Sequence, residues 1–260
     1  MKSFRPLSRR VVITGGASGI GARLAERFAE TGDQVAVCDA SEAAVRDFSA
    51  ENPGIRAVQA DVRDETAMDA FLGAIETDWG GVDVVCANAG IGGAAGRIED
   101  LTYQEWRDCV GVNLDGAYLT CRWAARLMRA QGNGLILLTS STSGQWGHPN
   151  RSPYAAAKWG IIGLMKTLAM ELGPVGVRVN AICPGAVEGP RMERVLQKQS
   201  AASGKNAEEI RRGYAEGTSL RTWVTADDIA DMALFLASPA ASKISGQAMA
   251  VDGHTETNSA

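Results

Sequence analysis

Short runs of apolar residues alternate along the whole chain with longer segments of helical periodicity. The runs are continuous, as expected for strands that are buried on both faces of a sheet. In the intervening segments apolar residues recur every three or four positions, as at Ile20, Leu24 and Phe28. This alternation predicts an α/β fold with about seven parallel strands and helices on both faces of the sheet. The predicted strands are 11–14, 34–38, 55–59, 82–87, 135–139, 177–182 and 248–251.

One segment departs from this rhythm. Residues 188–222 are polar and rich in charge, and they separate two predicted strands by a long interval. Long excursions in compact domains commonly cover functional sites, so we expect a helical lid over a substrate pocket, with a solvated surface insertion as the alternative. The chain of 260 residues contains no low-complexity linker and no internal repeat. We therefore expect one domain that spans residues 1–260.

Composition argues against several classes of protein. The net charge of −4, without a long basic run, argues against a nucleic-acid partner. No apolar stretch reaches eighteen residues, so we expect no membrane span. The basic N-terminus leads directly into the first strand without a signal core, and we expect a cytoplasmic protein. The five cysteines form no C-x-x-C pair and the two histidines no ligand-spaced pair, so we expect buried thiols and no metal.

A glycine-rich turn joins the first predicted strand to a helix. It reads T-G-G-A-S-G-I-G over residues 14–21. Such a turn lets a pyrophosphate approach the backbone and directs helix N-terminal N–H groups at the anion. Glycines also occur in such turns for packing alone, but a strand before and a helix after favour a dinucleotide site on a doubly wound, Rossmann-type sheet. We expect cofactor contacts from Gly15, Ser18, Gly19, Ile20 and Gly21.

Asp39 follows the second predicted strand, eighteen residues after the last glycine of that turn. A carboxylate there can accept hydrogen bonds from both adenosine ribose hydroxyls, and it would repel a 2′-phosphate. No lysine or arginine occupies 16–19 or 40–41 to compensate. We therefore predict NAD rather than NADP, with a turn aspartate that binds no ligand as the alternative. We also expect adenine contacts from Asp61 and Val62, and close passage of the cofactor at Asn88, Ala89 and Gly90.

Tyr154 and Lys158 are four residues apart on a predicted helix and therefore share one face. A tyrosine with the ordinary pKa of ~10 is protonated at pH 7, so service as a base needs that pKa lowered by roughly 2–3 units. A neighbouring ammonium lowers a tyrosine pKa in this way. The pattern alone is common on helices. Here the preceding strand ends in Ser140 and Ser141, at the crevice where α/β sheets bind ligands. Ser152 is the expected cap of the helix.

Together these motifs resemble those of the classical short-chain dehydrogenase/reductase family. The similarity covers essentially the whole chain in order, through T-G-G-A-S-G-I-G, N-A-G, Y-A-A-A-K, Pro184-Gly185 and S-G-Q-x-x-x-V-D-G at 245–253. It implies an oxidoreductase that transfers a hydride between NAD and an alcohol or ketone carbon. It also implies that helices predicted at 103–128 and 153–172 pair across a dimer interface, usually within a homotetramer.

The resemblance implies roles for individual residues. Asn113 would hold a water and bend its helix, and Tyr154 would be the acid/base. Lys158 would lower the tyrosine pKa and bind the ribose, and Tyr154 would also contact the cofactor. Ser141, rather than either neighbouring serine, matches the family's S-x-x-G pattern and would bind the substrate oxygen. Many members carry a threonine shortly after the valine of the nicotinamide loop, and this chain does not. The implied nicotinamide contacts are Pro184, Gly185 and Val187.

The sequence says less about the substrate. Arginines near the expected pocket could receive a carboxylate or phosphate, or could be solvated. The polar lid favours a polar alcohol such as a sugar, polyol or hydroxy acid. A ketone or 3-oxoacyl reductase using NAD(P)H, and a dinucleotide-sensing protein without catalysis, are the alternatives. Besides the lid, the candidates for substrate contact are Ser143, Trp146, His148, Trp159, Val187 and Met192, and the arginines are Arg97, Arg151 and Arg191.

Overall fold

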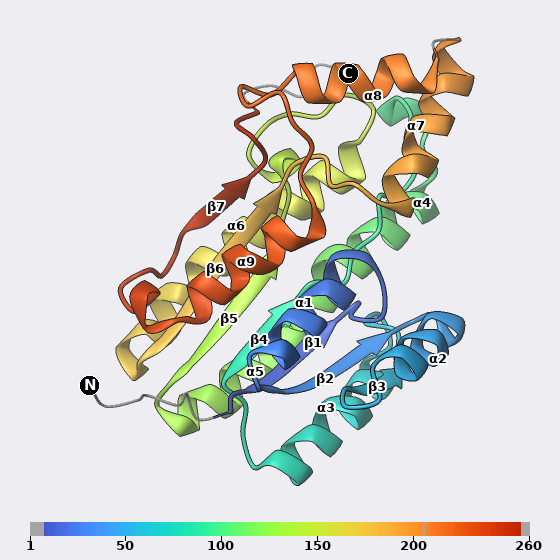
Figure 1. The fold of residues 1–260 in the computed structure, drawn as a ribbon. Coiled ribbons are helices and arrows are strands. Elements are labelled where there is room, and N and C mark those ends of the chain that lie inside the picture. Colours follow the sequence, from blue (N-terminus) through green and yellow to red (C-terminus); the bar gives the residue numbers. More distant parts are fainter. Residues whose placement is uncertain (1–7, 205, 256–260) are drawn as a thin grey trace.

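The seven predicted strands form one parallel sheet in the order β3-β2-β1-β4-β5-β6-β7 (Figure 1). The computed structural model describes residues 8–204 and 206–255. The prediction of a doubly wound, Rossmann-type α/β fold is confirmed. The strands are β1 (Arg10–Thr14), β2 (Gln34–Asp39), β3 (Arg56–Gln59), β4 (Val84–Ala87), β5 (Gly134–Thr139), β6 (Val177–Pro184) and β7 (Ala248–Val251).

The strand order reverses beside β1. Ile13 of β1 pairs with Val37 of β2 on one side and with Cys86 of β4 on the other. The chain therefore moves outward from β1 to β3, and then returns to the opposite side of β1 to begin β4. Open α/β sheets bind ligands at the carboxyl ends of the strands where the order reverses. The turns that follow β1 and β4 meet at this point.

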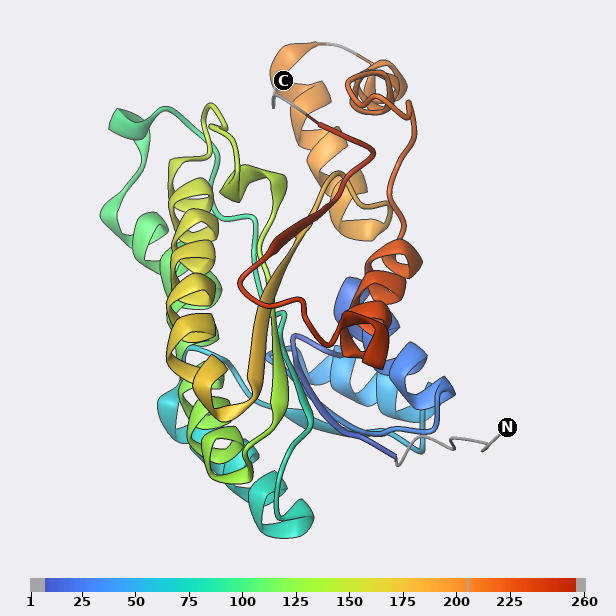
Figure 2. The same cartoon turned by 90° about the vertical axis from the view of Figure 1, so that its left-hand side faces the viewer.

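Helices cover both faces of the sheet (Figure 2). α3, α5 and α6 contribute to the buried cluster on one face, and α1, α2 and α9 to the cluster on the other. α7 and α8 lie beyond the carboxyl ends of β6 and β7 (Figure 1). The helices are α1 (Gly19–Glu30), α2 (Glu42–Glu51), α3 (Glu65–Trp79), α4 (Tyr103–Val110), α5 (Gly116–Gln131), α6 (Ser152–Leu172), α7 (Pro190–Ser203), α8 (Ala207–Glu216) and α9 (Ala226–Ala237).

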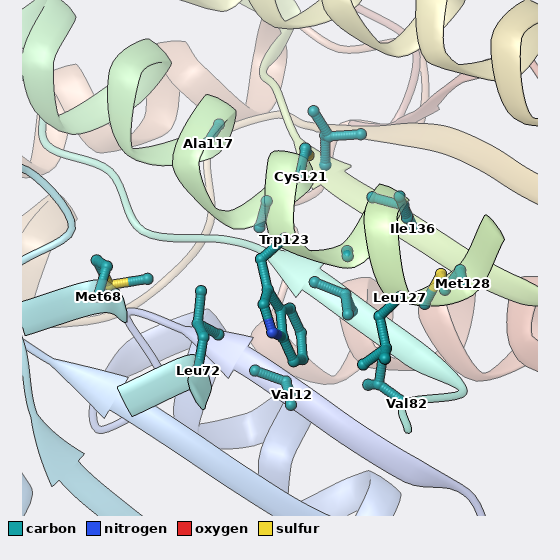
Figure 3. Close-up of a cluster of buried hydrophobic side chains, with 14 of the residues drawn as sticks. Val12, Met68, Leu72, Val82, Ala117, Cys121, Trp123, Leu127, Met128 and Ile136 are labelled. Carbon is teal, nitrogen blue, oxygen red and sulfur yellow. The ribbon is translucent and has the colours of Figure 1, made fainter. Parts of the chain in front are cut away.

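Trp123 anchors α5 in the first of these clusters. Figure 3 shows its ring among Leu72 of α3 and Val12 of β1. The indole Nε1 donates a hydrogen bond to the carboxylate of Glu76 at 3.1 Å. A buried tryptophan is favourable when its one polar atom has a partner. α5 is thus fixed against both α3 and the sheet.

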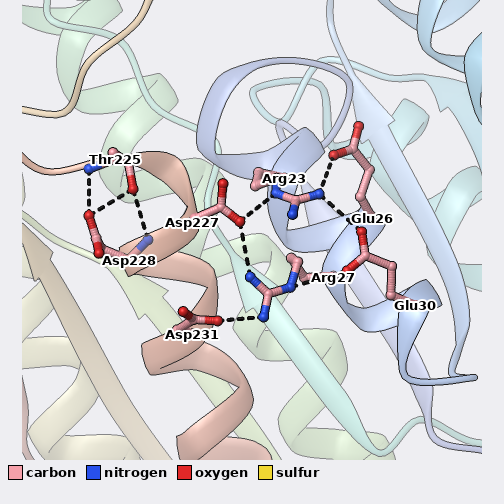
Figure 4. A network of polar contacts seen from close by, with 8 residues as sticks. All are labelled: Arg23, Glu26, Arg27, Glu30, Thr225, Asp227, Asp228 and Asp231. Carbon is pink, nitrogen blue, oxygen red and sulfur yellow. Dashed lines mark hydrogen bonds and ion pairs between the residues drawn. The ribbon is translucent and has the colours of Figure 1, made fainter.

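An ion-pair network joins α1 to α9 at the surface (Figure 4). Arg23 and Arg27 of α1 both donate to the Asp227 carboxylate of α9, at 2.8 and 3.0 Å. The bond from Arg23 is the main reason that the pKa of Asp227 lies below its ordinary value. Exposed ion pairs add little stability because water screens them. The shared buried cluster of α1 and α9 therefore contributes most to holding the two helices together.

Two helix boundaries differ from those expected. The helix predicted at 103–128 is divided into α4 and α5 by a π-helical turn, Gly111–Asp115, and α5 continues to Gln131. Such turns are often found at functional sites. The expectation that Ser152 caps the next helix is wrong. Ser152 is the first residue of α6, Arg151 occupies the cap position, and neither side chain makes a capping bond.

The segment 188–222 contains α7 and α8. Lys205, between the two helices, lies outside the described residues. The function of these helices as a lid stays a prediction.

All five cysteines are free and buried, and burial raises the pKa of the Cys86 thiol to about 12. Within 8–204 and 206–255, no helix is both long and apolar enough to cross a membrane. The same ranges hold no group of three or more His, Cys, Asp or Glu side chains arranged to bind a metal.

Candidate active site

The glycine-rich turn after β1 packs directly against the turn after β4. Gly15 has φ +61°, and a Cβ added to it would lie 2.7 Å from the Cα of Ala89. A Cβ on Gly21 would overlap the carbonyl oxygen of Gly15. Ser18 lies at the cap position of α1 without making a side-chain capping bond. The close packing excludes side chains at Gly15 and Gly21 and leaves the first backbone N–H groups of α1 at the turn, which is the arrangement that binds a pyrophosphate.

Asn88 ties three strand ends together. Its Nδ2 donates to the carbonyl oxygens of Thr14 and Gly15, both at 3.2 Å. Its Oδ1 accepts a bond from Thr139 Oγ1 at 3.0 Å. Thr14 Oγ1 in turn accepts bonds from the N–H groups of Asn88 and Ala89 at 3.2 and 3.3 Å. Neither threonine is among the site residues predicted from the sequence. The available signal was that each is the last residue of its strand.

Asp39 lies at the end of β2, close to the glycine turn. One carboxylate oxygen accepts a bond from the N–H of Ala17 at 3.3 Å, and the other from the N–H of Ser41 at 3.1 Å. These bonds fix the carboxylate beside the turn and leave each oxygen with further capacity to accept hydrogen bonds. The predicted NAD-selective position is thus adjacent to the predicted pyrophosphate site.

Asp61 has a partner that the sequence analysis did not anticipate. Arg63 donates to the Asp61 carboxylate from Nε at 3.1 Å and from a terminal nitrogen at 2.7 Å. The bond from Arg63 is the main cause of a lowered Asp61 pKa. Val62 is buried against Gly116, where a Cβ would lie 2.6 Å from its Cγ2. The contact between Asp61 and adenine stays a prediction, and the carboxylate that would make it is held by Arg63.

α6 brings Tyr154 and Lys158 together as their spacing predicts. The Lys158 Nζ lies 5.6 Å from the centre of the Tyr154 ring. Lys158 is 3% exposed, and its Nζ donates to the carbonyl oxygen of Thr139 at 2.8 Å. The hydroxyl of Ser140 donates to the Lys158 carbonyl at 2.8 Å. α6 is thereby held against the carboxyl end of β5.

The serines after β5 have different partners. Ser140 bonds to the α6 backbone, and Ser143 Oγ lies 2.7 Å from His148 Nδ1. Ser141 Oγ accepts a bond from the N–H of Ser143 at 3.2 Å. The Ser141 oxygen thus acts as an acceptor, while its hydrogen can be donated elsewhere. The assignment of Ser141, rather than Ser140 or Ser143, to the substrate oxygen stays a prediction.

Asn113 lies buried in the π-helical turn. Its Nδ2 donates to the carbonyl oxygens of Ile91 and Cys109, each at 2.9 Å. Its Oδ1 is buried without a hydrogen-bond partner in the described structure. A Cβ on Gly90 would lie 2.7 Å from this oxygen and 3.2 Å from Lys158 Nζ. Gly90 therefore keeps side-chain atoms out of a polar space between Asn113 and Lys158, where a bridging donor would satisfy the amide oxygen.

The end of β6 supplies the predicted nicotinamide loop. The N–H of Gly185 donates to the carbonyl of Val251 at 3.0 Å, and a Cβ on Gly185 would lie 2.8 Å from the Cβ of Asp252. Val187 forms an isolated parallel bridge with Val224. Pro184 is the last residue of β6. These contacts place the loop at the same edge of the sheet as the glycine turn, and they fit the predicted cofactor.

The candidates for substrate contact are distributed unevenly. His148 and Ser143 form a pair at the site, while Trp146 and Trp159 are each about half exposed. Met192 is half-buried in α7. Burial, and to a lesser extent the charge of Arg151, lowers the pKa of His148. Among the arginines, Arg97 is exposed, Arg151 is half-buried beside Tyr154, and the side chain of Arg191 lies outside the described part.

Residues 15–254 match the family model described as enoyl-(acyl carrier protein) reductase. Levodione reductase from Leifsonia aquatica is 34% identical over 252 residues, which cover 94% of this chain and 93% of that protein. The chain belongs to the classical short-chain dehydrogenase/reductase family. Another member, trans-4-hydroxycyclohexanecarboxylate dehydrogenase from Sinomonas cyclohexanicum, is 36% identical over 96% of this chain and 94% of its own length.

Solved structures of short-chain dehydrogenases/reductases share the fold over nearly the whole chain. The crystal structure of levodione reductase has a TM-score of 0.89 at 32% identity and covers 95% of this chain and 98% of its own. An actinorhodin polyketide ketoreductase with NADPH has a TM-score of 0.90 at 31% identity over 95% of this chain and 96% of its own. An NAD⁺-bound xylitol dehydrogenase has a TM-score of 0.89 at 27% identity and covers 94% of this chain and 98% of its own. Members of the family thus bind nicotinamide dinucleotides of both kinds.

Proposed function

We propose that this protein is an NAD-dependent dehydrogenase that transfers a hydride between the nicotinamide ring and a secondary alcohol or ketone. The observation that carries the proposal is the buried ammonium of Lys158, 5.6 Å from the Tyr154 ring and next to the strand end that bears Ser141. The substrate is a polar alcohol such as a sugar, polyol or hydroxy acid. α7 and α8 serve as the lid over it, and the protein acts in the cytoplasm.

Tyr154, Lys158, Ser141 and Asn113 share the work of the oxidation. Tyr154 accepts the proton of the substrate hydroxyl, because the neighbouring ammonium of Lys158 stabilises the phenolate. Ser141 donates its hydroxyl hydrogen to the substrate oxygen and holds that oxygen against the tyrosine. The bound nicotinamide supplies the carbon that accepts the hydride. Asn113 holds a water in the polar space next to Lys158, through which the lysine exchanges protons with solvent.

Most residues that would hold the cofactor lie at or just after the carboxyl ends of β1, β2, β3, β4 and β6. The glycine turn and the first N–H groups of α1 bind the pyrophosphate. Asp39 accepts bonds from the adenosine ribose, and Lys158 donates to the ribose beside the nicotinamide. Asp61 and Val62 lie at the adenine. The remaining contacts are Asn88, Ala89 and Gly90 along the cofactor and Pro184, Gly185 and Val187 at the nicotinamide.

We expect a preference for NAD over NADP of at least roughly tenfold in kcat/KM, about 1.4 kcal/mol. The reason is that the Asp39 carboxylate would lie against a 2′-phosphate, with no lysine or arginine at 16–19 or 40–41. Asp39→Ala should reduce the preference to near unity, mainly by improving the use of NADP. Steady-state kinetics with NAD and with NADP give the ratio of the two kcat/KM values for each protein. Asp47→Ala, an exposed aspartate of α2, is the matched control. Equal use of both cofactors by the unaltered protein would refute the argument.

The activity itself is tested by a panel of sugars, polyols, hydroxy acids and cyclic alcohols with NAD, and of the matching ketones with NADH. Levodione reductase and several 3-oxoacyl-[acyl-carrier-protein] reductases among the relatives favour ketone reduction as the second candidate. Comparing the two directions at equal substrate concentration separates them. Turnover of no alcohol or ketone with either cofactor, together with tight cofactor binding, would support a sensing protein instead.

We also propose that α5 and α6 pair across an interface in a homotetramer or homodimer. Trp159 and Met170 are about three helical turns apart on α6 and hence on one face, and they are 51% and 80% exposed. Tyr118 of α5 is half exposed as well. Met170→Glu should shift the mass measured by light scattering toward the monomer. Ile98→Glu, at an equally exposed position outside these helices, should leave it unchanged. A monomeric unaltered protein would contradict the proposal.

A further inference from the structure

Arg151 stands at the start of α6, against the reacting tyrosine. Its guanidinium carbon lies 5.1 Å from the centre of the Tyr154 ring. One terminal nitrogen donates to the carbonyl oxygen of Gly92 at 2.8 Å, which ties the side chain to the loop after β4. The contact with the ring and the bond to Gly92 hold the guanidinium on the wall of the site rather than in solvent. A positive charge is thus positioned next to the group that exchanges a proton with the substrate.

The part of the chain that the structure describes offers this charge no carboxylate partner. In the described ranges no carboxylate lies within ion-pair distance of Arg151, whereas arginines such as Arg9, Arg10 and Arg63 each have one. The Nε of Arg151 is buried without a hydrogen-bond partner in the same ranges. A half-buried guanidinium with a single recorded hydrogen bond is costly, because arginine offers five N–H donors. An anion from outside the chain would remove that cost.

The neighbouring histidine does not provide a competing charge. His148 Nδ1 lies 2.7 Å from Ser143 Oγ, and the main-chain N–H of Arg151 donates to the His148 carbonyl. Burial, followed by the charge of Arg151, lowers the pKa of His148, so the imidazole is neutral at pH 7. His148 and Ser143 therefore present a neutral polar surface, and the fixed charge at this wall belongs to Arg151.

We propose that the substrate is a hydroxy acid whose carboxylate binds Arg151 while its hydroxyl-bearing carbon lies at Tyr154. This inference rests on the proposed dehydrogenase function and names its substrate class. A guanidinium binds a carboxylate through two parallel N–H bonds, which fixes both distance and orientation. Because the guanidinium sits beside the tyrosine ring, the carboxylate and the reacting hydroxyl are separated by only a few bonds or by the width of one ring. Relatives named for trans-4-hydroxycyclohexanecarboxylate and for D-β-hydroxybutyrate act on acids of this kind.

The kinetic test compares an acid with its neutral counterpart. trans-4-Hydroxycyclohexanecarboxylate and trans-4-hydroxycyclohexanecarboxamide differ in charge and keep the same ring alcohol. The unaltered protein should favour the acid in kcat/KM. Arg151→Met should lower kcat/KM for the acid by roughly 10- to 100-fold more than for the neutral alcohol, mainly through KM. Arg151→Lys should restore part of the selectivity, and Arg46→Met, an exposed arginine of α2, should change neither substrate.

A binding test uses the two histidines as reporters. The proton resonances of His148 and His254 are followed by NMR as pH is varied, in the presence of NAD. Cyclohexanecarboxylate, which lacks the reacting hydroxyl, should raise the pKa of His148, because the bound anion offsets the charge of Arg151. Cyclohexanecarboxamide, which is neutral and also lacks a hydroxyl, should leave the pKa of His148 unchanged at the same concentration. His254, whose ring contacts Ser219, gives the second imidazole signal and is recorded in the same titration. In Arg151→Met the effect of the carboxylate should disappear.

The outcomes separate this inference from the function on which it rests. If alcohols are oxidised but the acid has no advantage, or if Arg151→Met lowers kcat/KM for acid and neutral alcohol alike, the carboxylate assignment is wrong and the dehydrogenase stands. If no substrate is turned over, the proposed function fails, and the NMR titration alone decides whether Arg151 binds a carboxylate. Unfolding curves for both Arg151 variants show whether any loss arises from a failure to fold.

Discussion

Tyr154→Phe is expected to lower kcat by about 10²- to 10⁴-fold, the range typical for loss of a positioned acid/base. The substitution removes one oxygen and keeps the ring, so the contacts of Lys158 and Arg151 with that ring are retained. Without the hydroxyl, no group at this position accepts the substrate proton as the hydride leaves. The change should appear in kcat and kcat/KM together, because the interaction is strongest in the transition state. Steady-state oxidation of the best substrate from the panel measures it.

Cofactor affinity provides the control for this prediction. The dissociation constant of NADH, followed by its fluorescence, should change little in Tyr154→Phe, because the glycine turn and Asp39 are untouched. Tyr103→Phe removes the same oxygen from a tyrosine of α4 that is 76% exposed, and it should leave kcat unchanged. Activity of Tyr154→Phe within a factor of two of the unaltered protein would overturn the proposed mechanism, whatever the substrate proves to be.

Gly21→Ala is expected to destabilise the fold by about 2–3 kcal/mol, the upper part of the range for overpacked positions. Gly21 lies in α1, where alanine is intrinsically preferred over glycine by about 1 kcal/mol. Packing reverses that preference here. The added methyl would overlap the carbonyl oxygen of Gly15 and lie 2.7 Å from Asn88 Nδ2. These are main-chain and hydrogen-bonded atoms, which cannot move without opening the turn, so cofactor affinity should fall as well.

Gly73→Ala is the matched substitution for this comparison. Gly73 also lies in a helix, α3, and a Cβ added there has no neighbouring atom within 4 Å. Its replacement should raise the free energy of unfolding by up to about 1 kcal/mol. Urea unfolding of the two variants, with the NADH dissociation constant measured for each, tests the pair. If Gly21→Ala were as stable as Gly73→Ala and bound NADH normally, the close packing of the two turns would be disproved.

The candidate site was predictable from sequence to the extent that local spacing determines it. Tyr154 and Lys158 meet because four residues make about one helical turn, whatever the rest of the fold does. Asp39 could be assigned because it directly follows the predicted strand 34–38, eighteen residues after the last glycine of the turn. The partner of Asp61 was not anticipated, although Arg63 is only two residues away. Side-chain rotation, rather than chain position, decides whether such a pair forms.

The chain pattern by itself determined the α/β class, the seven strands and the glycine turn. Strands buried on both faces are apolar throughout, so they are visible in the sequence as continuous apolar runs. A turn position against which another backbone packs closely must be glycine, so it is visible as well. Only the tertiary structure decided the joining of strand ends by Asn88 and Thr139, the π-helical turn that carries Asn113, and the position of Arg151 beside Tyr154, where no described carboxylate pairs with it. The first two features depend on atoms brought together from distant segments. The third depends on which charged groups lie near Arg151 in the folded chain. No periodicity along the chain encodes either condition.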